Sequence, residues 1–261
     1  MDSFFERYGR LIIVAVAVCF VLLLFTPLKN TIGNNINGFV SNFANQTNKS
    51  LNEVRMPGEV RTGDVVEVEG SKYIVLEQKE NSKVLVMTVE SIGKRAFQSN
   101  YKESTYLRPD GQNANTYENS EIDNYLENKW YEGLPIKMKK AVESTSIKQI
   151  SYSVYNHSKQ ETGYNGQIYN EINRHVFLPS VEEFSKVVDL NNSDKVKKLI
   201  NSADIWTRDS CQGYANLAVY LRAQYGGLDM QFLYHDCGIR PTFTVDLTKV
   251  DYKVVDTVNY K

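Results

Sequence analysis

The chain has 261 residues, enough for one large domain or two small ones with a hydrophobic core. Charged residues make up 23% and apolar residues 42%, which is typical of a largely ordered, globular protein. The 30 Lys and Arg residues against 31 Asp and Glu residues give a net charge of −1, which excludes the basic surplus of a typical nucleic-acid binder. We therefore expect no nucleic-acid partner. The 17 tyrosines suit either β-strands or a binding surface.

The first feature along the chain is a long apolar segment. Residues 11–25 read LIIVAVAVCFVLLLF, and the apolar stretch extends to residue 28. As a helix, residues 11–28 would reach roughly 27 Å, just enough to span the hydrocarbon core of a bilayer. Two arginines precede the segment, which favours a cytoplasmic N-terminus at residues 1–10 and a soluble part outside. No small-x-small cleavage site follows, so we expect an uncleaved single-pass anchor.

Residues 29–56 predict an amphipathic stem and a polar linker. Apolar side chains recur there with helical spacing, at Ile32, Ile36, Phe39, Val40 and Phe43. Such a stripe needs a partner, which can be its own domain, a sister helix or the lipid surface. We therefore expect self-association through residues 31–45 as one use of the stem.

Residues 57–261 predict one α+β domain that opens with strands. Val65–Val68 and Tyr73–Leu76 are rich in β-formers and are separated by a Glu-Gly-Ser turn, and residues 84–89 form a third strand. A polar stretch with Tyr and Asn follows, from residue 97 to residue 117.

Several helices are predicted from their capping residues. Ser120 caps a helix, a lysine-rich helix follows at Pro135–Val142, and Asn192 starts a helix that ends at Ile200. Ser180 and the glutamate three residues later form a capping box.

The C-terminal part predicts β-structure from Trp206 onward. Residues 217–221 and 228–233 are two strands, and the Gly226-Gly227 pair between them indicates a hairpin. We expect a last strand at residues 239–247.

Several of these segments resemble one bacterial family of uncharacterised domains. The resemblance rests on FLPSVEEF, IWTRDS and GIRPTFTVDL in the second half, and on RTGDVVEVEGSKYIVLE and SEIDNYLENKWYEGL in the first, and it covers about residues 58–250. It implies a C-type-lectin-like fold of short antiparallel strands and a few helices, in the branch shared with formylglycine-generating enzymes.

Residues 206–241 also resemble the variable region of proteins diversified by retroelements, in which fixed positions frame variable ones. The frame implied here is Trp206, Arg208, Gly226, Gly227, Gly238, Arg240 and Pro241. The residues implied to face a ligand are Asp209, Ser210, Tyr214, Asn216, Tyr220, Arg222, Tyr225, Asp229, Phe232, Tyr234, His235 and Asp236. Alternate side chains of a hairpin share a face, and Tyr and Arg often dominate interface energetics. An ordinary half-buried hairpin with its tyrosines packed inward is the open alternative.

The sequence offers few candidates for catalytic, metal-binding or cofactor-binding residues. His235 and Cys237 are two ligands where a zinc site needs three or four, and no phosphate loop, dinucleotide fingerprint or HExxH is present. Formylglycine-generating enzymes use two cysteines, but the surroundings of Cys211 and Cys237 do not match their active-site segment. A disulfide between these two cysteines is the other open alternative. We expect no enzymatic activity, no metal and no cofactor.

These observations favour a surface-displayed, adhesin-like protein that binds a protein or a glycan. Its location would be the cell membrane, with the domain outside, or a surface filament. The alternative is a structural or tip subunit of a filament, because ERYGRLII resembles the N-terminal helix of Flp-type pilins, although its order and spacing differ. A third reading is an oxidase of the formylglycine-generating type.

Overall fold

The computed structural model describes residues 59–153 and 166–261, and Val60–Lys261 forms one compact unit. The expected anchor at residues 11–28 and the expected stem at 29–56 lie outside the described residues. Within the two described ranges, no helix combines the length and the apolar character needed to cross a membrane.

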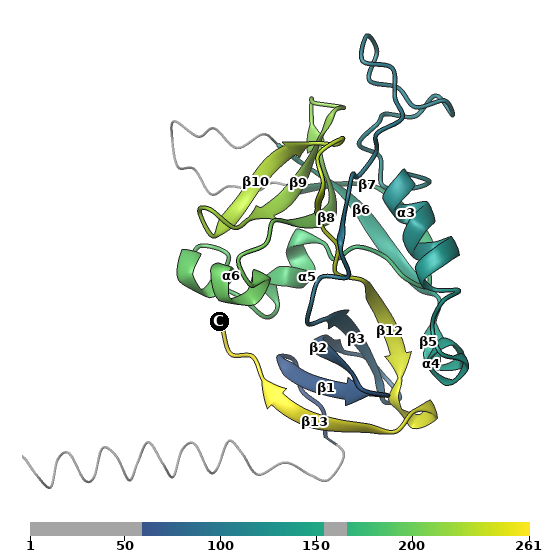
Figure 1. Ribbon diagram of the computed structural model, residues 1–261, viewed down its shortest axis with the longest axis vertical. Helices are drawn as coiled ribbons and strands as arrows, with labels where there is room; N and C mark the ends of the chain where they lie inside the picture. The colour runs from purple at the N-terminus through teal and green to yellow at the C-terminus, as the bar shows by residue number, and fades with distance from the viewer. Residues whose placement is uncertain (1–58, 154–165) are drawn as a thin grey trace, which may run out of the picture. The chain divides into compact units, whose positions relative to one another are not determined.

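The described fold is α+β, mostly sheet with a few short helices, as expected (Figure 1). The first sheet has six antiparallel strands whose central members are rich in valine and other β-branched residues. Its strands are, in spatial order, β13 (Tyr252–Thr257), β1 (Asp64–Val68), β2 (Ser71–Gln78), β3 (Lys83–Thr88), β12 (Thr242–Asp246) and β5 (Val142–Glu143). The pairing of β1 with β13 brings the two ends of the described domain together.

The expected final strand at residues 239–247 was wrong in its start and in being the last. Strand β12 begins at Thr242, and a 3-10 turn at Leu247–Lys249 leads into β13. The Asp246 side chain accepts the Thr248 backbone N–H at 3.0 Å, which caps the turn and ends β12. Most of β13 is exposed, so its sequence lacks the buried alternation that would reveal a strand.

The second sheet has seven strands. A path of five runs β10 (Gly227–Phe232), β9 (Leu217–Arg222), β8 (Ile205–Gln212), β11 (Cys237–Gly238) and β4 (Lys94–Arg95), and β6 (Thr145–Ser153) joins β8 while β7 (Gly166–Arg174) joins β6. The expected β9–β10 hairpin is confirmed, with Gly226 at φ 66° in its turn. A Cβ at Gly226 would lie 2.2 Å from the Ser193 carbonyl oxygen, so only glycine fits there.

The helices are α3 (Glu121–Tyr125), the π-turn η2 (Leu126–Trp130), α4 (Ile136–Ala141), α5 (Val181–Ser185) and α6 (Ser193–Ile200). Their caps are those expected from the sequence. The side chains of Ser120 and Asn192 accept backbone N–H groups at 3.2 Å each. The capping box of α5 is complete, because Ser180 and Glu183 each accept the backbone N–H of the other.

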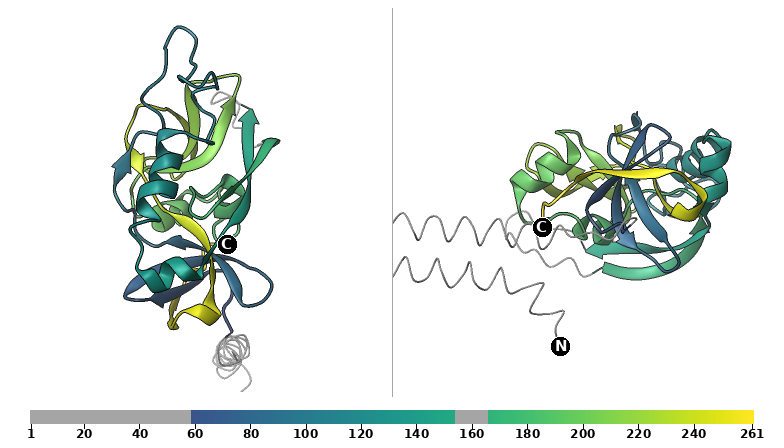
Figure 2. Two further views of the ribbon diagram at one scale, coloured as in Figure 1. Left: turned by 90° about the vertical axis from the view of Figure 1, so that its right-hand side faces the viewer. Right: turned by 90° about the horizontal axis from the view of Figure 1, so that it is seen from below.

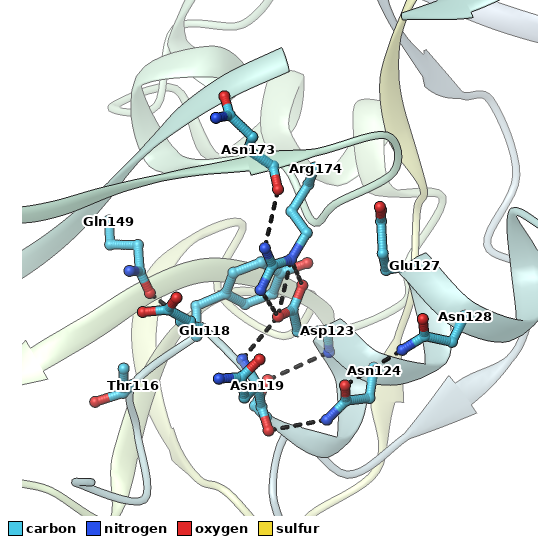
Figure 3. A network of polar contacts seen from close by, with 12 residues as sticks. Thr116, Glu118, Asn119, Asp123, Asn124, Glu127, Asn128, Gln149, Asn173 and Arg174 are labelled. Atoms are coloured by element: carbon cyan, nitrogen blue, oxygen red, sulfur yellow. Dashed lines mark hydrogen bonds and ion pairs between the residues drawn. The ribbon is translucent and has the colours of Figure 1, made fainter. Parts of the chain in front are cut away.

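A polar network ties the start of α3 to the β6–β7 hairpin (Figure 3). Arg174 on β7 donates to both carboxylate oxygens of buried Asp123, at 2.8–3.1 Å, and the same carboxylate accepts the Asn119 backbone N–H at 2.8 Å. Burial raises the pKa of Asp123, and the bonds from Arg174 counteract this. Gln149 on β6 accepts the Glu118 backbone N–H at 2.8 Å. The network therefore holds the chain where the long loop of residues 99–116 returns to the domain.

Candidate ligand-binding site

Three aromatic rings stack on one another at the surface, just beyond the end of β10. The Phe232 and Tyr234 rings lie 5.5 Å apart, and those of Tyr234 and His235 lie 4.7 Å apart, both stacked. Phe232 is 41% exposed and Tyr234 is 51% exposed. Large aromatic side chains dominate core and interface energetics, so stacked rings left in water are an unusual feature.

A second aromatic pair from a distant part of the sequence joins this group. Tyr101 and Tyr106 lie in the loop of residues 99–116, with their ring centroids 6.3 Å apart. The pKa of Tyr101 is raised mainly by burial, and the Glu103 carboxylate and the Tyr234 hydroxyl add to the rise. We call the set Tyr101, Tyr106, Phe232, Tyr234 and His235 the loop-end patch.

Figure 1 shows this loop (dark teal, at the top of the view) beside the ends of the β9–β10 hairpin. The contact is built from backbone hydrogen bonds just before the loop and from side-chain hydrogen bonds near its end. The carbonyl of buried Leu233 accepts the N–H groups of Phe97 and Gln98 at 2.8 and 3.1 Å. The Asn115 side chain donates to the carbonyls of Cys211, Tyr214 and Leu217 at 2.9–3.1 Å. These bonds fix the loop against the turns that carry the other rings.

The loop also has internal order. Isolated bridges join Lys102 to Leu107 and Leu107 to Asn113. Tyr106 adopts a left-handed backbone with φ 52°, and its carbonyl accepts the Ala114 N–H at 2.9 Å. An ordered loop loses less conformational entropy on binding than a mobile one, so this loop is suited to recognition.

Part of the expected ligand face lies at this end of the domain. Phe232, Tyr234 and His235 belong to the patch, and Asp236 beside them is exposed. Tyr214 is 50% exposed and Asn216 is half-buried, in the turn held by Asn115.

For four other residues the expected exposure was wrong. Asp209, Ser210, Tyr220 and Asp229 are all buried, with exposures of 0, 4, 2 and 8%. Strand β8 is covered on both faces, so alternation along it does not separate an inside from an outside. The Tyr220 ring packs 6.0 Å from the buried Trp206 ring, which is the inward-facing hairpin tyrosine that the sequence left open.

Arg222 and Tyr225 lie at the opposite end of the hairpin. Arg222 bonds Asp229 at 2.7 Å, and its guanidinium carbon lies 4.4 Å from the centroid of the Tyr225 ring. The hairpin strands have six residues each, which is roughly 20 Å of chain. The expected ligand face is therefore divided between two places, and these two residues are not part of the loop-end patch.

The expected frame residues are built into the core. The Trp206 indole donates to the Arg95 carbonyl at 2.9 Å. Arg208 forms a buried, two-pronged ion pair with Glu183 at 2.6 and 2.9 Å, which joins β8 to the capping box of α5. Burial opposes the charged form of both groups. The Arg208 charge nevertheless lowers the pKa of Glu183, and the Glu183 charge raises the pKa of Arg208.

The glycine and arginine of the GIRP segment have equally specific places. A Cβ at Gly238 would lie 2.8 Å from the Ile205 side chain and 3.0 Å from the Asp204 carbonyl. Arg240 donates to the carbonyls of Thr88 at 2.7 Å and Leu199 at 3.0 Å, which ties β3 to the end of α6. Burial lowers the pKa of Arg240 to about 10. Pro241, which lies between β11 and β12, is buried as well.

Cys211 and Cys237 are both free and buried, so the disulfide considered from the sequence is not formed. Burial raises the pKa of each thiol to about 12. A thiolate is the reactive form of cysteine, so both sulfurs are in surroundings that suppress nucleophilic chemistry. Among the described residues, no three His, Cys, Asp or Glu side chains are grouped to hold a metal.

The sequence did not single out Tyr101 and Tyr106. The signal was the density of tyrosines in the polar stretch from residue 97 to residue 117, but nothing local shows that this stretch reaches the end of β10.

Comparisons with known proteins give a family and no activity. Residues 81–247 match a family described as a domain of unknown function (DUF6273). Neither a curated protein nor a solved structure matches the chain. The match begins near β3 and ends at the close of β12, so it includes the whole second sheet and the loop-end patch. The chain belongs to the DUF6273 family.

Proposed function

We propose that this chain is a surface-displayed recognition protein whose loop-end patch binds a protein or a glycan. The observation that carries the proposal is the exposed stack of Phe232, Tyr234 and His235 beside Tyr101 and Tyr106. The apolar segment at residues 11–28 supplies the membrane anchor in this proposal, and the stem at residues 31–45 offers a surface for self-association.

The patch has the physical character of a binding surface. Aromatic side chains give a large contact area at a low cost in side-chain entropy. Their tips carry hydroxyl and imidazole groups that can make hydrogen bonds with a polar ligand. The rings are carried by turns that are held by hydrogen bonds of Leu233 and Asn115, so little conformational entropy is lost when a ligand binds.

A C-type-lectin-like fold is part of this proposal. Its support is the set of mostly antiparallel strands with few helices, together with the sequence segments that resemble that family. Diversification by a retroelement is a further part. Burial of Asp209 and Tyr220 limits it to the exposed positions, which are Tyr214, Tyr225, Phe232, Tyr234, His235 and Asp236. A reverse transcriptase and an adenine-rich near-copy of codons 206–241 beside the gene would support this, and their absence would remove it.

The two alternative functions have less support. The filament subunit depends on residues 1–58, outside the described residues, so no observed contact favours it. An oxidase of the formylglycine-generating type needs reactive thiols, and burial raises the pKa of both Cys211 and Cys237 to about 12.

Binding by a patch variant tests the proposal. The full-length chain and the triple variant Tyr106→Ser, Phe232→Ser, Tyr234→Ser would be applied to a glycan array and to an array of purified cell-surface proteins. The matched control is Ile136→Ser, Ile168→Ser, Tyr225→Ser, which removes three comparably exposed apolar side chains elsewhere.

We expect the control to keep the ligands of the parent chain and the patch variant to lose them. Removing several central aromatic contacts typically weakens binding by more than about tenfold per hot-spot residue. Unchanged binding by the patch variant, or equal losses in both variants, would contradict the proposal.

A further inference from the structure

A cleft lies between the β1–β2 turn and the segment that joins η2 to α4, away from the loop-end patch. Its volume is about 310 Å³, at the small end of the range for pockets that bind small molecules. Figure 2 shows β1 and β2 (dark blue) at one end of the described domain and the loop of residues 99–116 at the other. The cleft is therefore a separate site from the patch.

Aromatic rings form the walls and the floor of this cleft. Tyr73, Tyr125 and Trp130 line it, together with the apolar Leu134 and Met138. Phe243 lies behind it, with its ring 5.4 Å from that of Tyr73 and 5.9 Å from that of Trp130. Such walls suit an aromatic or large aliphatic group.

Two exposed residues of opposite charge line the same cleft. Glu69 lines it from the β1–β2 turn and Lys129 from η2. Neither side chain forms an ion pair or a side-chain hydrogen bond with any other described residue. Burial raises the pKa of Tyr73, the bond with Ser71 opposes this rise, and the Glu69 carboxylate adds to it. An unpaired carboxylate and an unpaired ammonium thus border one apolar space.

The backbone on both sides is unusual. Residues 126–130 form a π-turn, in which the Tyr131 N–H bonds the Leu126 carbonyl at 3.0 Å. Such turns are rare and are frequent at functional sites. Glu69 has φ 49°, a left-handed conformation that glycine or asparagine adopts at lower cost. Glu69 therefore occupies a backbone conformation that costs a glutamate more than it would cost glycine.

We propose that this cleft binds a free α-amino acid with an aromatic or large aliphatic side chain. Glu69 pairs with the ligand ammonium, Lys129 pairs with its carboxylate, and Tyr73, Tyr125 and Trp130 enclose its side chain. The complementarity is to a zwitterion, because each ligand charge meets one unpaired charge of the opposite sign. The site does not depend on the recognition function of the loop-end patch.

Tryptophan fluorescence of the full-length chain tests this proposal directly. The chain has two tryptophans, and Trp206 is fully buried in the core while Trp130 lines the cleft. The probes are L-phenylalanine, phenethylamine, which lacks the carboxylate, and 3-phenylpropionate, which lacks the ammonium. We expect a saturable change in emission with L-phenylalanine, and no change in the variant Trp130→Phe.

Charge variants then assign the two ends of the ligand. Lys129→Gln should weaken the binding of L-phenylalanine and of 3-phenylpropionate by about fivefold, which is the contribution of a partly exposed ion pair. The affinity for phenethylamine should not change. Glu69→Gln should weaken L-phenylalanine and phenethylamine and spare 3-phenylpropionate. The matched control Lys140→Gln, an exposed lysine on α4 that does not line the cleft, should change nothing.

Three results would overturn the proposal. The first is the absence of a saturable response to millimolar L-phenylalanine. The second is binding of phenethylamine as tight as that of L-phenylalanine, which would indicate a cleft for organic cations. The third is an effect of Lys129→Gln no larger than that of Lys140→Gln.

Discussion

Arg208 shows how much of this domain depends on buried charge. Its guanidinium and the Glu183 carboxylate are both almost fully shielded from water, and their hydrogen bonds join β8 to α5. The Arg208 guanidinium also donates to the carbonyls of Lys148 and Leu178 at 2.9 Å each. Removing it would leave the buried Glu183 carboxylate without its counter-charge, with only the Ser180 N–H among the described groups still donating to it, and would take one donor from each of the two carbonyls.

We therefore predict that Arg208→Met destabilises the domain by about 3–5 kcal/mol, the usual loss when one partner of a buried ion pair is removed. The matched control is Arg222→Met, because the Arg222–Asp229 pair is partly exposed and should be worth about 1 kcal/mol or less. Urea unfolding followed by circular dichroism measures both. Equal losses in the two variants would show that the Arg208 pair has no special role.

Asp209 makes the domain less stable as the pH rises, which is the opposite of the usual effect of a carboxyl group. Burial raises the pKa of this carboxyl from 3.8 to about 7, while Arg208 and the Val181 N–H counteract it only partly. The Asp209 Oδ2 accepts that N–H at 2.6 Å, and its Oδ1 has no hydrogen-bond partner among the residues that the structure describes. Because the folded state holds the proton more tightly than the unfolded state, the contribution of Asp209 is full below about pH 4 and is lost as the pH rises through 7.

We predict that Asp209→Asn removes this loss of folding stability at higher pH. The stability of the variant relative to the parent chain should rise between pH 5 and pH 8, by at most a few kcal/mol at about 1.4 kcal/mol per pKa unit. Urea unfolding at several pH values measures the difference. A difference that stays constant from pH 5 to pH 8 would mean that Asp209 does not titrate in this range.

The two buried cysteines predict slow thiol chemistry. With both thiol pKa values raised to about 12, the thiolate fraction at pH 7.5 is very small. In a Cys19→Ser variant, we expect a thiol reagent such as DTNB to modify Cys211 and Cys237 only after unfolding. Two equivalents should then react without prior reduction. A native protein that gives no free thiols even in denaturant would show that a disulfide joins the pair.

At the scale of elements, the β1–β2 turn combines strain with a binding role. Glu69 and Gly70 have φ values of 49° and 80°, the left-handed pair typical of a tight two-residue hairpin turn. Asn at the first position would keep the turn and relieve part of the cost of the left-handed conformation.

We predict that Glu69→Asn raises the stability of the domain by up to about 1 kcal/mol and weakens the binding of L-phenylalanine in the cleft. Calorimetry gives the melting temperature, and the fluorescence titration gives the affinity. A variant that loses both stability and binding would point to a structural role for the Glu69 side chain instead.

Local signals in the sequence predicted many of the elements. Ser120, Asn192 and the Ser180–Glu183 box each act within one helical turn, so their roles do not depend on distant parts of the chain. The β9–β10 hairpin was predicted because Gly226 supplies the left-handed turn. Strands β1 to β3 were predicted from their runs of valine, leucine and isoleucine.

The β6–β7 hairpin was missed because its strands are largely polar. Gln149 and Asn170 lie side by side in its register, and the exposed Ile168 breaks any alternation between apolar and polar residues. It joins the domain through the parallel pairing of β6 with β8 and through the Arg174–Asp123 pair, a contact between residues 51 positions apart. Pairings of that kind leave no periodic trace in the sequence.

At the scale of the whole described domain, the two sheets share one hydrophobic core that includes Phe97, Trp206 and Phe243. This shared core explains why four of the expected ligand-facing residues, Asp209, Ser210, Tyr220 and Asp229, are buried. A residue such as Tyr220 alternates correctly along its strand, but both sides of its sheet are covered. The exposed rings are instead at the last residue of β10, in the turn that follows it and in the loop of residues 99–116, where no regular alternation applies.

The most direct test of the account is hydroxyl-radical footprinting of the full-length chain, free and bound to a ligand selected on the arrays. Oxidation of each aromatic side chain reports its access to water. We predict strong protection of Tyr106, Phe232, Tyr234 and His235 on binding, and unchanged oxidation of the equally exposed Tyr225 and Tyr169. Protection of Tyr225 or Tyr169 with the loop-end patch left open would contradict the claim that this patch is the recognition surface.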